Sequence, residues 1–165
     1  LATAGKAIQQ GDYAEALPAA KEALALNPDN VNAKYMLIDC YIETGSIDTA
    51  KALLEEIKLV DQDSRYKSLA GKIELAEQAA DTPEIRQLQA AVEANPDDLQ
   101  LKVDLAVQLQ QANKAQDALE LLYSVLKKKL GFGDARKLMM DMVNALADGD
   151  PLKSEYRRKV YSLLY

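Results

Sequence analysis

The chain has 165 residues, of which 48% are apolar and 28% charged, a balance typical of one globular domain or one short helical array. It contains no histidine and one cysteine, which excludes His-ligated zinc, Ser-His and Cys-His catalytic sites, an internal disulfide and a CxxC redox pair, so we expect no enzymatic activity, metal or cofactor. The net charge is −6, divided into −10 over residues 1–122 and +4 over residues 123–165, and this acidic majority disfavours nucleic acid as a partner.

The first residues carry neither an initiator methionine nor the apolar core of a signal peptide. We therefore interpret the chain as a fragment whose N-terminal portion is missing. No apolar run approaches the ~18 residues that a membrane-spanning helix needs, so we expect no membrane partner. A free cysteine without disulfides favours the cytoplasm as the compartment.

Small residues recur along the chain at a fixed period, and this period is the strongest signal in the sequence. Gly11 and Gly45 are one period apart, Ala16 and Ala50 share that spacing, and Ala118 follows Ala50 by two periods. A small alanine lets two helices approach closely, and glycine permits the tight turn between them. The period is about 34 residues, and with these residues it resembles the helix–turn–helix unit of the tetratricopeptide repeat.

Two prolines set the frame of these repeats. Pro28 and Pro96 are two periods apart, and each ends one repeat while the following residues start the next helix. The frame predicts a partial first repeat over residues 1–30 and full repeats over 31–64, 65–98 and 99–132.

The third repeat lacks the usual glycine and alanine, yet its two helices are predicted over residues 64–80 and 83–94, with Thr82 capping the second. After the fourth repeat the frame slips, and residues 133–165 are predicted to form a C-terminal helical hairpin, with helices near 134–147 and 151–164, packed on the array. The predicted fold class is therefore all-α, a tetratricopeptide-like right-handed array of about ten antiparallel helices.

The first helices of the repeats are predicted to line a groove, which is the usual ligand site of such arrays. Its expected residues are partly apolar: Tyr35, Met36, Asp39, Tyr66, Leu69 and Ile73. Some arrays clamp a terminal carboxylate with Lys and Asn residues at groove positions where this sequence offers Tyr, Leu, Met and Asp, so we expect no such clamp. Two interpretations stay open: the groove binds a peptide or client, or it packs against another part of the same protein.

The predicted last helix carries two stripes of side chains. Leu152, Tyr156 and Val160 recur at helical spacing and are expected to pack on the preceding helix, whereas Arg157 and Tyr161 follow a neighbouring face. Arginine and tyrosine are enriched at the energetic centres of interfaces, although a capping helix with a solvated face is an equal alternative. The residues that we predict to bind a partner are Tyr156, Arg157, Arg158, Tyr161, Leu164 and Tyr165.

Three segments resemble a single bacterial family: LVDQDSRY at 59–66, QAADTPEI at 78–85 and YRRKVYSLLY at 156–165. They are similar to the thioredoxin-like chaperedoxins of the YbbN/CnoX type, and the resemblance covers essentially the whole chain. In that family an N-terminal thioredoxin-fold domain precedes a C-terminal tetratricopeptide-like domain. The resemblance thus implies that this chain is the second domain alone.

The resemblance also implies a function, that of a redox-linked co-chaperone of holdase type. Such a protein binds unfolding clients under oxidative stress and hands them to refolding chaperones, including the GroEL chaperonin, and its own thioredoxin-fold domain is a further partner. The segment 156–165 corresponds to the family's chaperonin-docking helix. The redox-active cysteine of the family belongs to the other domain, so Cys40 is expected to be a small buried hydrophobe.

Two other functions stay open. One is a scaffold module of an unrelated multiprotein complex, for example in secretion or envelope assembly, where such arrays also serve. The other is an enzyme that uses carboxylates or lysine, although the repeat spacing shows no convergent ionisable groups.

Overall fold

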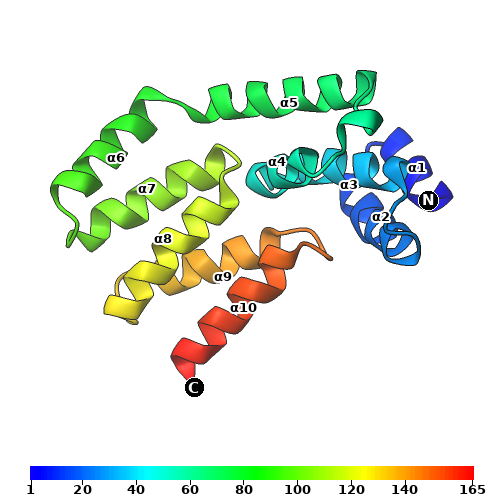
Figure 1. Ribbon diagram of the computed structural model, residues 1–165. Helices are drawn as coiled ribbons and strands as arrows, with labels where there is room; N and C mark the ends of the chain where they lie inside the picture. The colour runs from blue at the N-terminus through cyan, green and yellow to red at the C-terminus, as the bar shows by residue number, and fades with distance from the viewer. The chain divides into compact units, whose positions relative to one another are not determined.

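The structure is a computed structural model that describes residues 1–165 as ten α-helices and one short 3₁₀ helix, with no strand (Figure 1). The α-helices are α1 (Ala2–Gln9), α2 (Tyr13–Leu26), α3 (Val31–Glu43), α4 (Ile47–Glu55), α5 (Ser64–Ala80), α6 (Pro83–Ala94), α7 (Leu99–Gln111), α8 (Ala115–Lys128), α9 (Ala135–Ala145) and α10 (Pro151–Leu164), and the 3₁₀ helix η1 (Leu59–Asp61) lies between α4 and α5. The predicted all-α class with about ten helices is thus confirmed. No helix combines the length and the apolar character needed to cross a bilayer.

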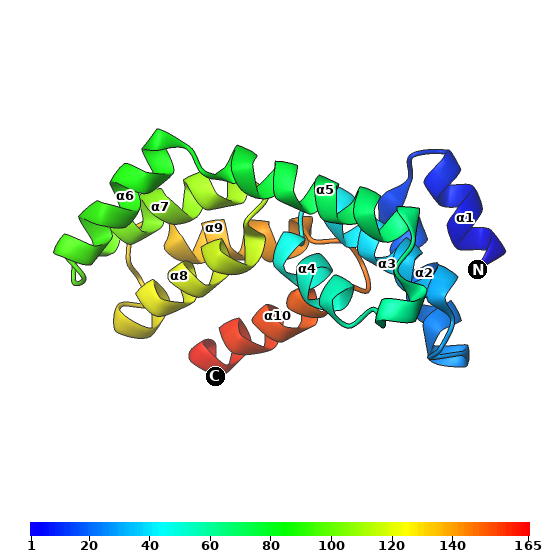
Figure 2. The same ribbon diagram turned by 45° about the horizontal axis from the view of Figure 1, so that its top comes forward.

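The helices form two compact units. Unit 1 contains residues 1–77 and 147–150, and unit 2 contains residues 78–146 and 151–165. Within unit 1, helices that follow one another in the chain pack together, α1 on α2, α2 on α3 and α3 on α4. Within unit 2, α6 packs on α7, α7 on α8 and α8 on α9, and α10 packs on both α8 and α9 (Figures 1 and 2).

In three repeats, the turn between the two helices contains a residue with a left-handed backbone conformation, that is, a positive φ angle. The φ angle is 75° at Gly11, 88° at Gly45 and 62° at Asn113, and all three occupy the same position of the repeat frame. Asparagine is among the few other residues that adopt this conformation readily. In the third repeat Ala79 takes that position, and α5 continues through it to a length of 17 residues.

Side-chain caps fix where several helices begin. In each case a cap oxygen accepts a hydrogen bond from the backbone N–H three residues later: Asp12 from Glu15, Asn30 from Ala33, Thr82 from Ile85 and Asp98 from Leu101, at 3.0–3.2 Å. Such a bond satisfies one of the donors that the first helical turn leaves without an intrahelical partner. The predicted cap at Thr82 is confirmed, and it starts α6 at Pro83.

The turn between α9 and α10 belongs to unit 1, although both helices belong to unit 2. Asp150 is buried in this turn and accepts a hydrogen bond from the Ser46 hydroxyl at 2.5 Å. The Lys21 ammonium donates to the carbonyl oxygen of Gly149. Gly149 has a φ of 86°, and an added Cβ would lie 3.7 Å from Pro18. The turn is therefore part of the packing of α2 and of the α3–α4 corner.

Each unit has its own apolar core. Leu17 and Ile38 are almost completely buried in unit 1, and Leu122 and Met139 are buried in unit 2. The alanines that define the repeat frame have no exposed surface: Ala16, Ala50 and Ala118. Their burial agrees with the predicted role of small residues at close helix contacts.

Enlarging these alanines tests the repeat frame. Ala50→Leu and Ala118→Leu are each expected to lower the free energy of unfolding by roughly 1–3 kcal/mol, because the larger side chain overpacks a site without free space. Ala90→Leu, on the exposed face of α6, is the matched control and should change stability by under ~0.5 kcal/mol. Urea unfolding followed by circular dichroism measures all three, and equal midpoints would show that the frame is misplaced.

Candidate functional site

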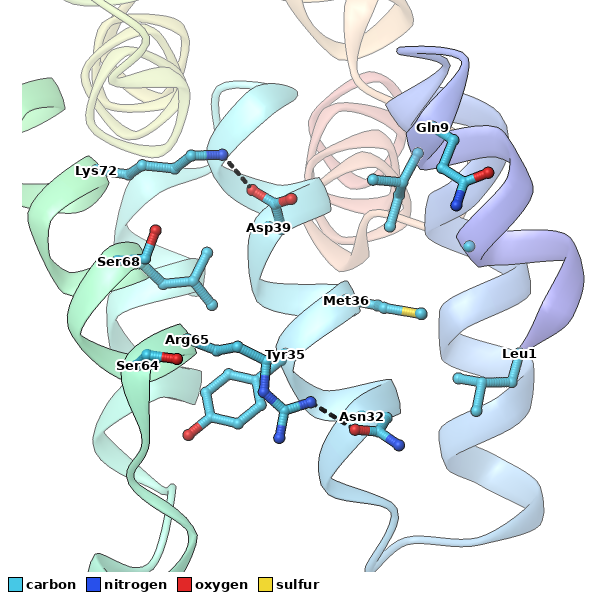
Figure 3. A pocket seen from close by; sticks show the side chains of 13 residues that line it. Leu1, Gln9, Asn32, Tyr35, Met36, Asp39, Ser64, Arg65, Ser68 and Lys72 are labelled. Atoms are coloured by element: carbon cyan, nitrogen blue, oxygen red, sulfur yellow. Dashed lines mark hydrogen bonds and ion pairs between the residues drawn. The ribbon is translucent and has the colours of Figure 1, made fainter.

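A groove of about 690 Å³ lies in unit 1, with α3 at its base and with α1 and α5 as its walls (Figure 3). This volume lies within the roughly 300–1,000 Å³ typical of ligand clefts. Its lining residues are Leu1, Gly5, Ile8, Gln9, Asn32, Tyr35, Met36, Asp39, Ser64, Arg65, Ser68, Leu69 and Lys72.

The base of the groove and its α1 wall are largely apolar. The Met36 side chain extends from α3 toward α1 (Figure 3), and its methyl group lies close to Gly5, where an added Cβ would be 3.5 Å away, an ordinary van der Waals contact. Ile8 and Leu69 add aliphatic surface from the two walls. An unbranched methionine among such residues forms an adaptable apolar surface.

Arg65 belongs to the α5 wall, and its side chain extends over the base of the groove. Its guanidinium carbon is 4.6 Å from the centre of the Tyr35 ring, Nη2 donates to Asp63 Oδ2 at 2.8 Å, and Nη1 donates to Asn32 Oδ1 at 2.5 Å. The hydrogen bond with Asp63 raises the pKa of Arg65 and lowers the pKa of Asp63, so both groups are charged at neutral pH. The stacked and hydrogen-bonded guanidinium is therefore held in place over the groove.

Lys72 is the second cation of the α5 wall, two helical turns beyond Arg65. Its ammonium donates to Asp39 Oδ1 at 2.8 Å and to Glu43 Oε1 at 3.2 Å. Burial alone lowers the pKa of Lys72, but the two hydrogen bonds outweigh burial and raise the pKa above its usual value. The ammonium is therefore fully charged at neutral pH.

The structure brings together four of the six residues predicted for the groove. Tyr35, Met36, Asp39 and Leu69 line it. The other two predicted residues, Tyr66 and Ile73, pack instead in the core of unit 1.

Tyr66 and Ile73 do not line the groove because the groove face of α5 lies one residue before the positions that the repeat frame assigns. Ser64, Arg65, Ser68, Leu69 and Lys72 face the groove, and the last four have the i, i+3, i+4, i+7 spacing of one helix face. Sequence reasoning therefore missed both cations. The spacing of these four residues was the signal that could have identified the groove face of α5. The third repeat has no turn glycine that would have fixed the repeat frame on this helix.

The buried face of α10 contains one of the predicted partner contacts. Tyr156 is only 2% exposed and lies in the core of unit 2, on the same face as Leu152 and Val160. Tyr156 is therefore a core residue, which corrects its assignment as a partner contact. Leu164 is half-buried and packs against the same core, so it offers a partner only part of its side chain.

The other predicted partner residues of α10 are exposed. Arg157 and Arg158 lie on its solvent face, and Tyr161 and Tyr165 are 50% and 98% exposed. The rings of the two tyrosines stack, with centroids 6.4 Å apart and an angle of 24° between their planes. This face thus carries two cations and an aromatic pair in solvent.

Cys40 lies in the middle of α3 and has no exposed surface, as predicted for a small buried hydrophobe. Burial, and then the charge of Asp39, raise the pKa of its thiol to about 12. At neutral pH the thiol is therefore protonated, and the thiolate is the form that reacts. No group of three or more acidic or cysteine side chains is placed to hold a metal ion.

Comparison with protein families gives two matches, both to models described as tetratricopeptide repeat. One model matches residues 7–73 and the other matches residues 78–165. The boundary between the matches coincides with the end of the continuous part of unit 1.

Two similar proteins cover almost all of the chain. An uncharacterized protein of Haemophilus influenzae is 41% identical over 162 residues, which are 96% of this chain and 74% of that protein. A crystal structure of a domain from a Vibrio parahaemolyticus protein of unknown function is 40% identical, covers 98% of this chain and 96% of its own, and gives a TM-score of 0.83. The fold is thus shared with the Vibrio parahaemolyticus domain over almost its whole length.

Proposed function

Since this chain belongs to the tetratricopeptide repeat family, whose members bind other proteins, we propose that it is the interaction module of a redox-linked co-chaperone in the cytoplasm. In this proposal the module holds unfolding clients and passes them to refolding chaperones, including the GroEL chaperonin. A thioredoxin-fold domain N-terminal to the module supplies the redox chemistry, so Cys40 takes no part in it. The resemblance of residues 59–66, 78–85 and 156–165 to the chaperedoxins supports this assignment.

The exposed face of α10 is the observation that carries the proposal. Tyr161 and Tyr165 form a stacked pair in solvent, and Arg157 lies one turn before Tyr161 on the same face. Arginine and tyrosine dominate the energetic centres of protein interfaces because they combine a large contact area with hydrogen-bonding groups. The opposite face of the helix already packs in the core, so the aromatic face is available for a partner.

Binding to purified GroEL tests the proposal. Arg157→Ala and Tyr161→Ala are each expected to weaken binding by roughly 30-fold, the effect of removing a central interface side chain that contributes ~2 kcal/mol. Both residues are exposed, so the melting temperature should hardly change. Isothermal titration calorimetry measures the affinity, and thermal melts followed by circular dichroism measure the stability.

Arg136→Ala is the matched control, because Arg136 is an exposed arginine of the same unit on α9. Full-strength binding by the double variant Arg157→Ala, Tyr161→Ala would show that the face is ordinary solvated surface. Absence of GroEL binding by the unmodified chain would instead favour the scaffold alternative.

A further inference from the structure

Cations and aromatic rings join α10 to α8 in unit 2, where the two helices pack together and run in the same direction (Figures 1 and 2). The Lys159 ammonium lies 4.5 Å from the centre of the Tyr156 ring and 5.5 Å from the centre of the Tyr123 ring. The Lys127 ammonium lies 4.8 Å from the centre of the Tyr123 ring. Glu155 holds Lys159 in place through an ion pair of 3.1 Å. Tyr123 and Lys127 therefore extend the exposed face of α10 onto α8.

Most cations of this surface have no carboxylate partner within the protein. Lys127, Arg157 and Arg158 are exposed, and none of them makes an ion pair. The C-terminal halves of the two helices, residues 122–128 and 157–164, contain no Asp or Glu. The surface therefore has an excess of positive charge that another molecule can neutralise.

We propose that the docking surface of this chain spans α10 and the C-terminal half of α8, and that its partner is a protein surface rich in Asp and Glu. The inference rests on the proposed function, since Arg157 and Tyr161 belong to both. It adds Tyr123 and Lys127 to the contact and assigns acidic chemistry to the chaperonin surface. Carboxylates of the partner accept from Lys127, Arg157 and Arg158, in charge-assisted hydrogen bonds about twice as strong as neutral ones.

The distribution of charge along the chain favours a partner with a local acidic surface. Residues 1–122 carry a net charge of −10, and residues 123–165 carry +4. An acidic surface is therefore attracted to the last quarter of the chain and repelled by the remainder. A long polyanion such as RNA would meet that negative remainder as well, whereas a protein presents its carboxylates over a limited area. The tyrosine rings add contact area for the apolar side chains at the centre of a protein interface.

The kinetics of association with purified GroEL at several salt concentrations test the proposal. The association rate constant is expected to fall about tenfold or more between about 25 and 400 mM NaCl, because salt screens the attraction between oppositely charged surfaces. The dissociation rate constant should change much less, since charges at the edge of an interface act mainly on association. Surface plasmon resonance measures both constants.

Charge reversal on α8 locates the second half of the surface. Lys127→Glu is expected to lower the association rate constant about fivefold or more at low salt, and the difference should shrink at high salt. Lys67→Glu, at an exposed position of α5, changes the net charge by the same amount and is the matched control. Circular dichroism spectra show that both variants are folded.

A zero-length cross-linker identifies the chemistry of the partner surface. A carbodiimide condenses an amine with a carboxylate into an amide only where the two groups are in contact. Mass spectrometry of the treated complex should therefore find an amide between the Lys127 side chain and an Asp or Glu of GroEL, and none at Lys67.

The outcomes separate this inference from the proposed function. The inference is overturned by an association rate constant that does not depend on salt, by equal rate constants for Lys127→Glu and Lys67→Glu, or by the absence of a cross-link at Lys127. Each of these results leaves the proposed function standing if Arg157→Ala and Tyr161→Ala still weaken binding. Absence of GroEL binding by the unmodified chain would overturn both.

Discussion

Replacing Tyr156 with alanine is expected to lower the free energy of unfolding by about 3–5 kcal/mol, the range for removing a large aromatic side chain from a core. Tyr156 is almost fully buried where α10 meets α8 and α9, beside Leu152 and Val160. The Lys159 ammonium lies 4.5 Å from the centre of its ring and adds a cation–π contact. Truncation therefore removes both the ring that joins α10 to its unit and the partner of a neighbouring cation.

Two further variants show whether the loss of stability comes from the buried ring of Tyr156, from its hydroxyl, or from removing any tyrosine of α10. Tyr156→Phe keeps the ring and removes a hydroxyl that makes no hydrogen bond to another protein group, so its effect should stay below about 1 kcal/mol. Tyr161→Ala removes an exposed tyrosine from the same helix and should cost under ~0.5 kcal/mol. Chemical denaturation measures all three, and a similar loss for Tyr156→Ala and Tyr161→Ala would mean that the packing face of α10 is assigned incorrectly.

Raising the pH above about 9 is expected to destabilise the protein through three buried weak acids. Burial raises the pKa of Cys40, Tyr41 and Tyr156 to about 12 in each case, with smaller contributions from nearby carboxylates. Their ordinary values are 9.0 for the thiol and 10.0 for the phenols. The unfolded chain therefore loses these protons at lower pH than the folded chain, and ionisation favours unfolding.

Because the three pKa values are raised in the folded protein, stability is lost between the ordinary pKa values and the raised ones. The contribution of these three protonated groups to the free energy of unfolding is fully present below pH 9. It is lost between pH 9 and about 12, at roughly 1.4 kcal/mol per pH unit for each group that titrates. Cys40→Ala should remove the fall that begins near pH 9, and Tyr41→Phe and Tyr156→Phe should each reduce the slope above pH 10. Tyr165→Phe, at an exposed position, is the control. Urea midpoints that stay constant from pH 8 to 11 would contradict the prediction.

Features encoded within a few residues were predictable from the sequence. The helices expected at 64–80 and 83–94 match α5 and α6, because Thr82 and Pro83 fix the junction locally. The left-handed turns likewise follow from single residues such as Gly45. Such signals depend on backbone conformation, which a short segment determines largely by itself.

Features that depend on packing between distant segments were not predictable. The rotation of α5 that turns Arg65 and Lys72 toward the groove is set by its contacts with α3, since the frame alone assigns the neighbouring positions. The helical stripe predicted that Tyr156 lies on an apolar face, but the stripe alone does not show whether this face packs within the chain or against a partner. The turn at 147–150 has the sequence of an ordinary surface loop, and nothing local indicates that Asp150 meets Ser46.

Because residues 147–150 belong to unit 1, they affect the order in which the two units can finish folding during synthesis. Ser46 and Asp150 are 104 residues apart, so at the usual ~5–20 residues per second the ribosome adds Asp150 about 5–20 s after Ser46. From the completion of α5 until Asp150 is added, the nascent chain contains every helix of unit 1 but not its closing turn. The N-terminal unit, though made first, therefore finishes folding only after α6 to α9 of the other unit have been synthesised.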